Sequence, residues 1–255
     1  MSNLSPYYQD SSITLYHGDW RDVLPHLDSV DVTITDPPYS ARVHSVVRSR
    51  EMGRRDRGAG GAASARVVDL GFSCLTDEER LTVAKEFGRL TKRWVLTFSD
   101  IESIHSWRAD MQAAGLQYVR TGAWVRENGA PQFSGDRPAE GFEAITICHR
   151  PGRKRWNGGG RRAVWSVPVV IDRGHNGARL HPTQKPDALM RSLVELFSEP
   201  GETILDPYAG SGSTLVAANY LGRKAIGVEK NELYCERTVT RLQQLVLAFS
   251  EEAGA

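Results

Sequence analysis

An aspartate, two prolines and a tyrosine stand together at positions 36–39, directly after a stretch that alternates apolar and polar residues. The alternation over 30–35 predicts a half-buried strand, which the two prolines end in a stiff turn. Asp36 and the Pro37 carbonyl can both accept hydrogen bonds from an amine on a flat ring, and Tyr39 offers a ring face for stacking. Taken alone, the four residues support an ordinary turn as well as they support chemistry.

A second cluster of candidate residues spans 203–229. Its pattern predicts a strand, a turn through Gly210 and Gly212, a helix, and a second strand that ends at Glu229. Such a βαβ unit is typical of nucleotide sites, where the second acid meets ribose hydroxyls. The third glycine of the dinucleotide fingerprint is missing, and Asp206 at the strand end would repel a pyrophosphate but attract an ammonium and a sulfonium. The unit therefore favours S-adenosylmethionine over NAD.

Composition indicates an ordinary globular chain. Its 255 residues are 40% hydrophobic and 25% charged, which suits one α/β domain with an insertion. We see neither an apolar run long enough to span a membrane nor a targeting segment at the start, and therefore expect a soluble cytoplasmic protein. The three cysteines are far apart, so we expect neither disulfides nor a metal site.

Positive charge is concentrated in two stretches although the net charge is only +1. Residues 40–68 are rich in arginine and glycine, and we expect a mobile loop that grips phosphates through Arg42, Arg48, Arg50, Arg54 and Arg55. Residues 149–180 interleave tryptophans with basic residues, a pattern that suits nucleic-acid contact through Arg153, Lys154 and Arg155. A surface insertion without a ligand explains this second stretch equally well.

The remaining pattern predicts the elements that must position these residues. Strands are expected at 13–16, 94–98, 118–125 and 142–148, and helices after Thr76 and over 189–197. This alternation argues for a mostly parallel, doubly wound sheet with an antiparallel edge. Asp19 follows a strand end, where it either caps a helix or meets a ligand. Lys185 stands at a helix entrance, where it is either solvated or paired with a ligand carboxylate.

Taken together, the motifs resemble those of the DNA amino-methyltransferases. The similarity covers most of the chain and lies in Asp36-Pro37-Pro38-Tyr39, in the segment 181–186 and in the glycine motif 206–214. The order, catalytic motif first, is that of the family's β group. The resemblance implies one circularly permuted, Rossmann-like domain over 1–255, with 149–180 as the target-recognition region. It also implies site-specific transfer of a methyl group from S-adenosylmethionine to N6 of a flipped-out adenine in duplex DNA.

The resemblance further implies a role for each matched residue. Asp36, Pro37 and Tyr39 would be catalytic. Asp206, Gly210, Gly212 and Thr214 would line the methionine end of the cofactor, with Tyr208 and Ser213 in the same motif. Thr183 or Lys185 would lie near the cofactor carboxylate. Glu229 would hold the ribose, and Asp19 would meet the adenine amine.

Other functions stay open at this point. Transfer to N4 of cytosine uses the same chemistry, and Asp rather than Ser before the prolines leans toward adenine in this family. RNA or a protein glutamine could be the substrate, although the motif order favours duplex DNA. A catalytically silent DNA-binding protein with the same fold is the alternative from another class, and a dehydrogenase is disfavoured by the missing glycine. A homodimer and a companion restriction endonuclease are possible partners.

Overall fold

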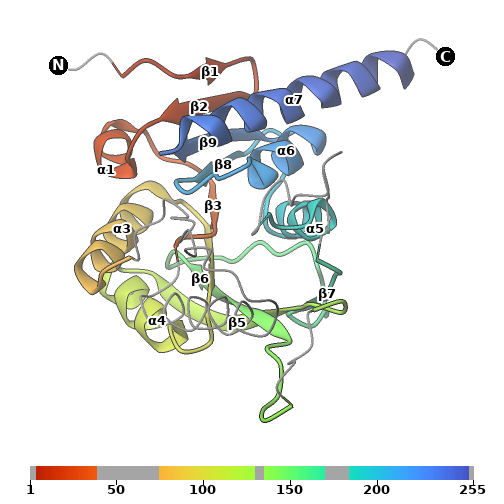
Figure 1. Ribbon diagram of the computed structural model, residues 1–255. Coiled ribbons are helices and arrows are strands. Elements are labelled where there is room, and N and C mark those ends of the chain that lie inside the picture. The colour runs from red at the N-terminus through yellow and green to blue at the C-terminus, as the bar shows by residue number, and fades with distance from the viewer. Residues whose placement is uncertain (1–3, 39–74, 130–134, 170–183, 253–255) are drawn as a thin grey trace, which may run out of the picture.

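The computed structural model describes residues 4–38, 75–129, 135–169 and 184–252, with side chains described up to residue 244. Tyr39, the arginines of 40–68 and Thr183 lie outside these residues. The described strands form a nine-stranded sheet in the order β1-β2-β9-β8-β3-β4-β6-β5-β7 (Figure 1). They are β1 (Tyr8–Gln9), β2 (Ile13–His17), β3 (Val32–Thr35), β4 (Trp94–Ser99), β5 (Gln117–Val125), β6 (Phe142–His149), β7 (Val164–Ser166), β8 (Thr203–Asp206) and β9 (Lys224–Glu229).

The sheet is parallel through its centre and mixed at its edges. Strands β2, β9, β8, β3 and β4 run parallel, whereas β6 is antiparallel to both β4 and β5. At the two edges, β1 runs antiparallel to β2 and the short β7 runs parallel to β5. The predicted α/β class, with a mostly parallel sheet and antiparallel pairing at one side, is therefore confirmed.

Helices cover both faces of the sheet. The helical elements are α1 (Trp20–Val23), the 3-10 helix Leu24–His26, α3 (Asp77–Leu90), α4 (Ile104–Ala113), α5 (Asp187–Phe197), α6 (Ser213–Tyr220) and α7 (Glu232–Glu252). Figure 1 shows α3 and α4 on one side, with α5, α6 and α7 on the other. The buried residues divide accordingly: Phe87 and Met111 belong to one apolar cluster, and Leu193 and Leu215 to the other.

Strand β3 is buried on both faces, so the expectation of a half-buried strand was wrong. Val32 and Ile34 lie in the cluster under α5 and α6, while Thr33 and Thr35 face the other way and are also buried. Their hydroxyls are satisfied inside the protein, because Thr33 Oγ1 lies 2.7 Å from Thr91 Oγ1 and Thr35 donates to Asp206. The alternation in the sequence thus separates two covered faces of a central strand.

The stretch 149–180 contributes to the core where it is described. Trp165 lies on β7 and is only 7% exposed, and the Trp156 ring packs 4.8 Å from the Phe197 ring. Trp165 belongs to the apolar core and Trp156 is partly buried against it, so both rings pack within the fold, and DNA contact through 149–180 stays a prediction. Cys148 and Cys235 are buried and free, and the described residues contain no cluster suited to a metal ion. None of the described helices is long and apolar enough to cross a membrane.

Candidate functional site

Four predicted site residues follow the carboxyl ends of parallel strands and so come to one edge of the sheet. Asp36 follows β3, Asp206 ends β8, Glu229 ends β9, and Asp19 follows β2. The strand register places them at a common level, because Thr33 pairs with Leu205 and Asp206 pairs with Gly227. Ligands of open α/β sheets bind at this edge. The structure therefore gathers residues that are up to 210 positions apart in the chain.

Asp206 is a buried carboxylate held by neutral donors. Its Oδ1 accepts from Thr35 Oγ1 at 2.8 Å and from the Tyr208 amide at 3.2 Å, and its Oδ2 accepts from Thr214 Oγ1 at 2.6 Å. Asp206 is only 3% exposed to solvent. Burial, aided by the nearby charge of Asp36 and opposed by these hydrogen bonds, raises the pKa of Asp206 to about 6. The site thus holds an acidic group that a cationic ligand would stabilise in its charged form.

Glu229 stabilises the turn that precedes α6 through hydrogen bonds from main-chain amides. Its Oε2 accepts from the Gly210 amide at 2.8 Å, and its Oε1 accepts from the Asn231 amide at 2.7 Å. Burial raises the pKa of Glu229, although the two amides oppose the shift. Gly210 and Gly212 have φ values of 52° and 78°, in the left-handed region that favours glycine. The glycines therefore shape a backbone turn between two carboxylates, where a ligand can approach the main chain closely.

Asp19 performs the structural role that the sequence left open. It accepts from the Arg21 amide at 3.0 Å as the N-cap of α1, and its Oδ2 pairs with the Arg21 guanidinium at 2.7 Å. Lys230 lies 3.5 Å from the same oxygen. Although burial opposes it, the Arg21 amide and charge together lower the pKa of Asp19. The capping interpretation is therefore confirmed, and a role of Asp19 toward a ligand stays a prediction.

Tyr208 and Ser213 lie on either side of the same turn. The Tyr208 ring lies 6.5 Å from the Trp20 ring, and its hydroxyl is buried with no hydrogen-bond partner among the described residues. Burial raises the pKa of Tyr208 well above its usual range. Ser213 Oγ donates to the Lys185 carbonyl at 3.0 Å and so ties the start of α6 to the segment before α5. A buried hydroxyl without a hydrogen-bond partner calls for an explanation, and a ligand acceptor beside the glycine turn would supply one.

Asp36 lies against Lys185, which approaches from the segment before α5. Lys185 Nζ is 2.5 Å from Asp36 Oδ2 and 3.1 Å from Glu143 Oε2. Asp36 Oδ1 is buried and has no hydrogen-bond partner among the described residues. Burial raises the pKa of Asp36, which Lys185 counteracts and Glu143 reinforces. For Lys185, burial lowers the pKa, but the two carboxylates together outweigh burial and leave it raised.

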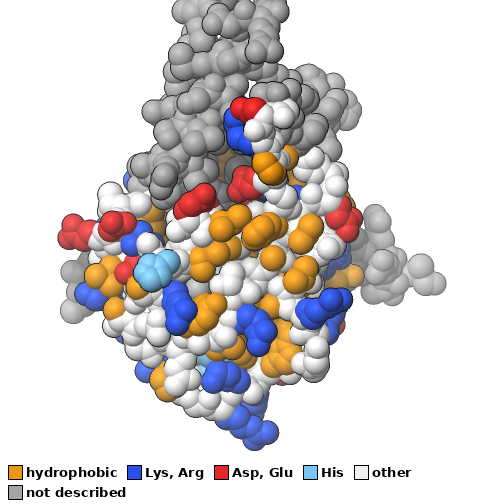
Figure 2. Space-filling model, turned by 90° about the horizontal axis from the view of Figure 1, so that it is seen from below, with side chains coloured by type: hydrophobic (Ala, Val, Ile, Leu, Met, Phe, Trp, Pro, Cys, Tyr) orange, Lys and Arg blue, Asp and Glu red, His pale blue; other side chains and the backbone are white. Residues whose placement is uncertain are grey.

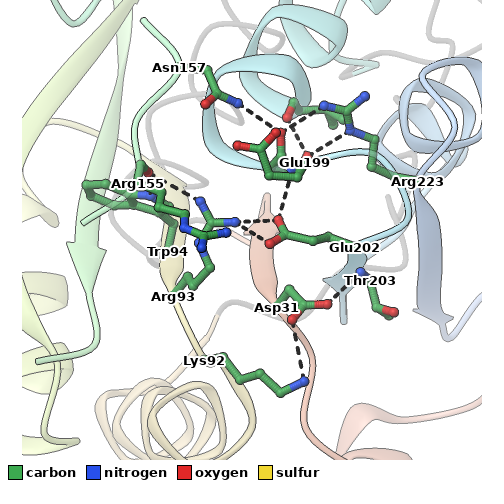
Figure 3. Close-up of polar contacts among 12 residues, drawn as sticks. Asp31, Lys92, Arg93, Trp94, Arg155, Asn157, Glu199, Glu202, Thr203 and Arg223 are labelled. Atoms are coloured by element: carbon green, nitrogen blue, oxygen red, sulfur yellow. Dashed lines mark hydrogen bonds and ion pairs between the residues drawn. The ribbon is translucent and has the colours of Figure 1, made fainter. Parts of the chain in front are cut away.

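The basic residues Arg153, Lys154 and Arg155 lie near the amino end of β4, opposite to the strand ends that carry the site. The Arg155 carbonyl accepts from the Trp94 indole at the amino end of β4, while the site lies at the carboxyl end of that strand, roughly 17 Å away. Figure 3 shows the network at this edge, in which Arg93 pairs with Glu202 and Asp31 accepts from the Thr203 amide at 2.9 Å. Residues 153–155 thus lie near the amino end of β4, away from Asp36, and their contact with DNA stays a prediction.

The surface seen from below in Figure 2 carries positive charge without concentrating it. Lys and Arg side chains are spaced across this face, and hydrophobic side chains gather between them. Among the described residues, Val164 of β7 is 53% exposed and Phe142 of β6 is 36% exposed. The described side chains visible in this view thus show basic groups spaced among hydrophobic ones and not gathered into one patch.

Sequence reasoning missed Glu143 and Thr35. Glu143 is the second residue of β6, and because β6 is antiparallel to β4 with Ala144 opposite Ser99, Glu143 lies just beyond the carboxyl end of β4. The acidic residue at the start of a strand that is otherwise buried was a signal, but its use required knowing that β6 is antiparallel. Thr35 was treated as a solvent-facing strand residue, whereas it donates to Asp206.

Comparison with known proteins supports one family. Residues 30–240 match the family model described as DNA methylase (N6/N4). Similar relatives are the type II methyltransferase M2.DpnII of Streptococcus pneumoniae, 24% identical over 93% of this chain and 92% of the relative, and M2.LlaDCHI of Lactococcus lactis subsp. cremoris, also 24% identical, over 94% of this chain and 92% of the relative.

Two solved structures show the same fold. The M1.HpyAVI–SAM complex matches with a TM-score of 0.65 at 20% identity, over 90% of this chain and 98% of that structure. The PvuII DNA methyltransferase, described as cytosine-N4-specific, matches with a TM-score of 0.71 at 14% identity, over 94% and 89%.

Proposed function

This chain belongs to the N6/N4 DNA methylase family, and from that membership we propose that it transfers a methyl group from S-adenosylmethionine to N6 of an adenine in duplex DNA. The observation that carries the proposal is the common edge of the sheet, where Asp36 and the cofactor motif around Asp206 lie together. Asp36 offers a buried acceptor without a partner among the described residues, as an exocyclic amine requires.

The residues at this edge fit S-adenosylmethionine. Asp206 and Glu229 are buried carboxylates whose hydrogen bonds come from hydroxyls and amides, so a ligand with positive charge stabilises both. The left-handed turn leaves open space at Gly210, where a ligand can approach the main chain, while Gly212 packs against Thr238. Asp206, Gly210, Gly212 and Thr214 would hold the methionine end and Glu229 the ribose, with Tyr208 beside them. Asp19 would meet the adenine amine of the cofactor.

The chain's own residues then prepare the target amine. When bound, S-adenosylmethionine supplies an electrophilic methyl group. An aryl amine is a weak nucleophile because its lone pair is delocalised into the ring. Acceptance of its two N–H groups by Asp36 Oδ1 and the Pro37 carbonyl favours a pyramidal nitrogen with its lone pair available. The Asp36 charge also stabilises the positive charge that develops on that nitrogen.

The target base leaves the duplex in this proposal, because a stacked amine cannot be approached in line. Unstacking costs a few kcal/mol, and stacking on Tyr39 would offset part of this, at about 1–3 kcal/mol. Such positioning brings the amine within reach of the methyl group without a covalent enzyme intermediate.

The type II names of the two bacterial relatives support a companion restriction endonuclease that reads the same DNA sequence.

Transfer to N4 of cytosine is the second candidate. The structural likeness to a methyltransferase described as cytosine-N4-specific favours it, whereas the Asp before the two prolines favours adenine by resemblance to the family. The deciding experiment incubates the purified protein with S-adenosylmethionine and unmethylated genomic DNA, followed by modification-sensitive sequencing. We expect methylated adenines in one short sequence context; methylated cytosines would support the second candidate, and unmodified DNA would overturn both.

A further inference from the structure

The Lys185 side chain lies in an enclosed box of opposite charge and aromatic rings. Its residue is 7% exposed, and its ammonium contacts Asp36 Oδ2 at 2.5 Å and Glu143 Oε2 at 3.1 Å. The same nitrogen lies 4.9 Å from the centre of the Phe98 ring and 5.7 Å from that of Trp124, within the range of cation–π attraction. A lysine held on four sides has little freedom to reach a ligand elsewhere.

The contact with Lys185 gives the two carboxylate oxygens of Asp36 different roles. Oδ2 is occupied by the ammonium, whereas Oδ1 is buried with no hydrogen-bond partner in the described part of the chain. A carboxylate fixed through one oxygen cannot rotate freely about its side-chain bonds. Lys185 therefore holds the other oxygen in one direction, as an acceptor for an incoming N–H group.

Glu143 holds Lys185 from the far side and continues a chain of alternating charge. Arg126 at the end of β5 lies 3.5 Å from Glu143 Oε1, and Glu143 in turn lies 3.1 Å from Lys185. The series Arg126, Glu143, Lys185, Asp36 thus runs from the antiparallel half of the sheet to the catalytic turn. Each buried charge has an oppositely charged neighbour, which is the arrangement that makes burial of charge tolerable.

We propose that Lys185 and Glu143 are positioning residues for methyl transfer, which orient Asp36 and set its charge, and that Lys185 is not a ligand of the cofactor carboxylate. The proposal rests on the proposed function. It replaces the expectation drawn from the family resemblance, under which Lys185 would lie near the methionine end of the cofactor.

Charge makes the two residues act on Asp36 in opposite directions. The ammonium of Lys185 favours the ionised form of Asp36, whereas the Glu143 carboxylate favours the protonated form. From β8, Asp206 also faces this group and interacts with the Asp36 charge. Methyl transfer requires ionised Asp36, because only the carboxylate accepts from the amine without competing as a donor. With saturating cofactor, whose positive charge keeps Asp206 ionised, the acid limb of kcat against pH therefore reports the pKa of Asp36.

The test compares Glu143→Gln and Lys185→Gln with the wild type. We measure the pH dependence of kcat with saturating cofactor and DNA, and cofactor affinity by calorimetry. Glu143→Gln should move the acid limb to lower pH and Lys185→Gln to higher pH, each by about one unit or more. Lys185→Gln should also lower kcat at neutral pH about 10- to 100-fold. Cofactor Kd should stay within about threefold in both variants.

Glu202→Gln is the matched control for the loss of a buried carboxylate. Glu202 pairs with Arg93 at the opposite edge of the sheet, and its side chain is 17% exposed against 11% for Glu143 (Figure 3). This variant should lose thermal stability without moving the acid limb. If Lys185→Gln fails to fold, Glu143→Gln still tests the proposal, because its shift to lower pH is independent of Lys185 removal.

Two results would overturn the proposal. One is an acid limb that stays in place, or moves in the same direction, in both variants. The other is a tenfold or larger loss of cofactor affinity in Lys185→Gln, which would make Lys185 a cofactor ligand. If the wild type transfers no methyl group, the proposed function fails instead, and carboxyl-carbon NMR of Asp36, assigned with Asp36→Asn, then measures the opposite pKa shifts directly.

Discussion

Replacing Asp206 by asparagine should make the stability of the protein less sensitive to pH. Burial raises the pKa of Asp206 from its ordinary value of 3.8 to about 6 in the folded protein. The folded wild type therefore binds this proton more tightly than the unfolded chain. Its free energy of unfolding gains from the protonated group at low pH and loses that contribution as the pH rises through about 4 to 6. Asparagine has no such proton, so the variant lacks this loss.

The magnitude follows from the shift. About two pKa units correspond to roughly 3 kcal/mol in total, of which about 2 kcal/mol falls between about pH 4.5 and pH 8. The difference in unfolding free energy between variant and wild type should change by that amount over this range, in favour of the variant at high pH. Hydrogen bonds that the asparagine alters change the unfolding free energy by the same amount at both pH values, so their effect cancels in this comparison.

Urea unfolding at a series of pH values, without cofactor, provides the measurement. S-Adenosylmethionine should then stabilise the wild type more than the variant at about pH 8, because its positive charge pairs with the ionised carboxylate, and its Kd should rise at least about tenfold in the variant. A difference between the two proteins that is independent of pH would show that Asp206 is not destabilised by burial and would refute the reasoning.

Three further predictions concern the site and the DNA. Asp36→Ala should lower methyl transfer at least about 100-fold while cofactor Kd, measured by calorimetry, stays unchanged; near-normal turnover would rule out Asp36 as the amine acceptor. Gly212→Ala should destabilise the protein by more than about 1 kcal/mol in urea unfolding, because φ is 78° and the new Cβ would overlap the Thr238 side chain; unchanged stability would show that the turn can relax. Reversing the charge of Arg48, Arg54 and Arg55 should flatten the salt dependence of DNA affinity, and an unaltered slope would exclude residues 40–68 as a phosphate-binding segment.

Local signals in the sequence predicted most of the fold. The Thr76 capping box opens α3, with both reciprocal hydrogen bonds present, and the strand, glycine turn and helix after residue 203 fold as the βαβ unit. Two short strands were missed, β1 with two residues and β7 with three, and the long helix α7 was not predicted although its apolar pattern is as clear as that of α3. Formation of the two strands depends on pairing and packing with distant elements, which periodicity within a short window does not contain.

The site was predictable only one motif at a time. Asp36 and Asp206 were each predicted as site residues from their neighbours in the chain. The rule that ligands bind at strand carboxyl ends indicated that both lie in one site. Pairwise contacts were not predictable. Lys185 was recognised as a residue that could meet a carboxylate, but its partners on β6 and after β3 depend on the antiparallel placement of β6. Likewise, the positive charge of 153–155 could be seen in the sequence, whereas the position of these residues near the amino end of β4 could not be predicted from it.

Transfer of labelled methyl groups into DNA tests the central claim most directly. The purified protein is incubated with tritiated S-adenosylmethionine and unmethylated duplex DNA, and the digested nucleosides are separated by chromatography, with Asp36→Ala alongside. We predict that the label appears in N6-methyladenine with the wild type and is absent with the variant. Label in N4-methylcytosine would contradict the choice of base, and unlabelled DNA from a folded wild type that binds the cofactor would contradict methyl transfer itself.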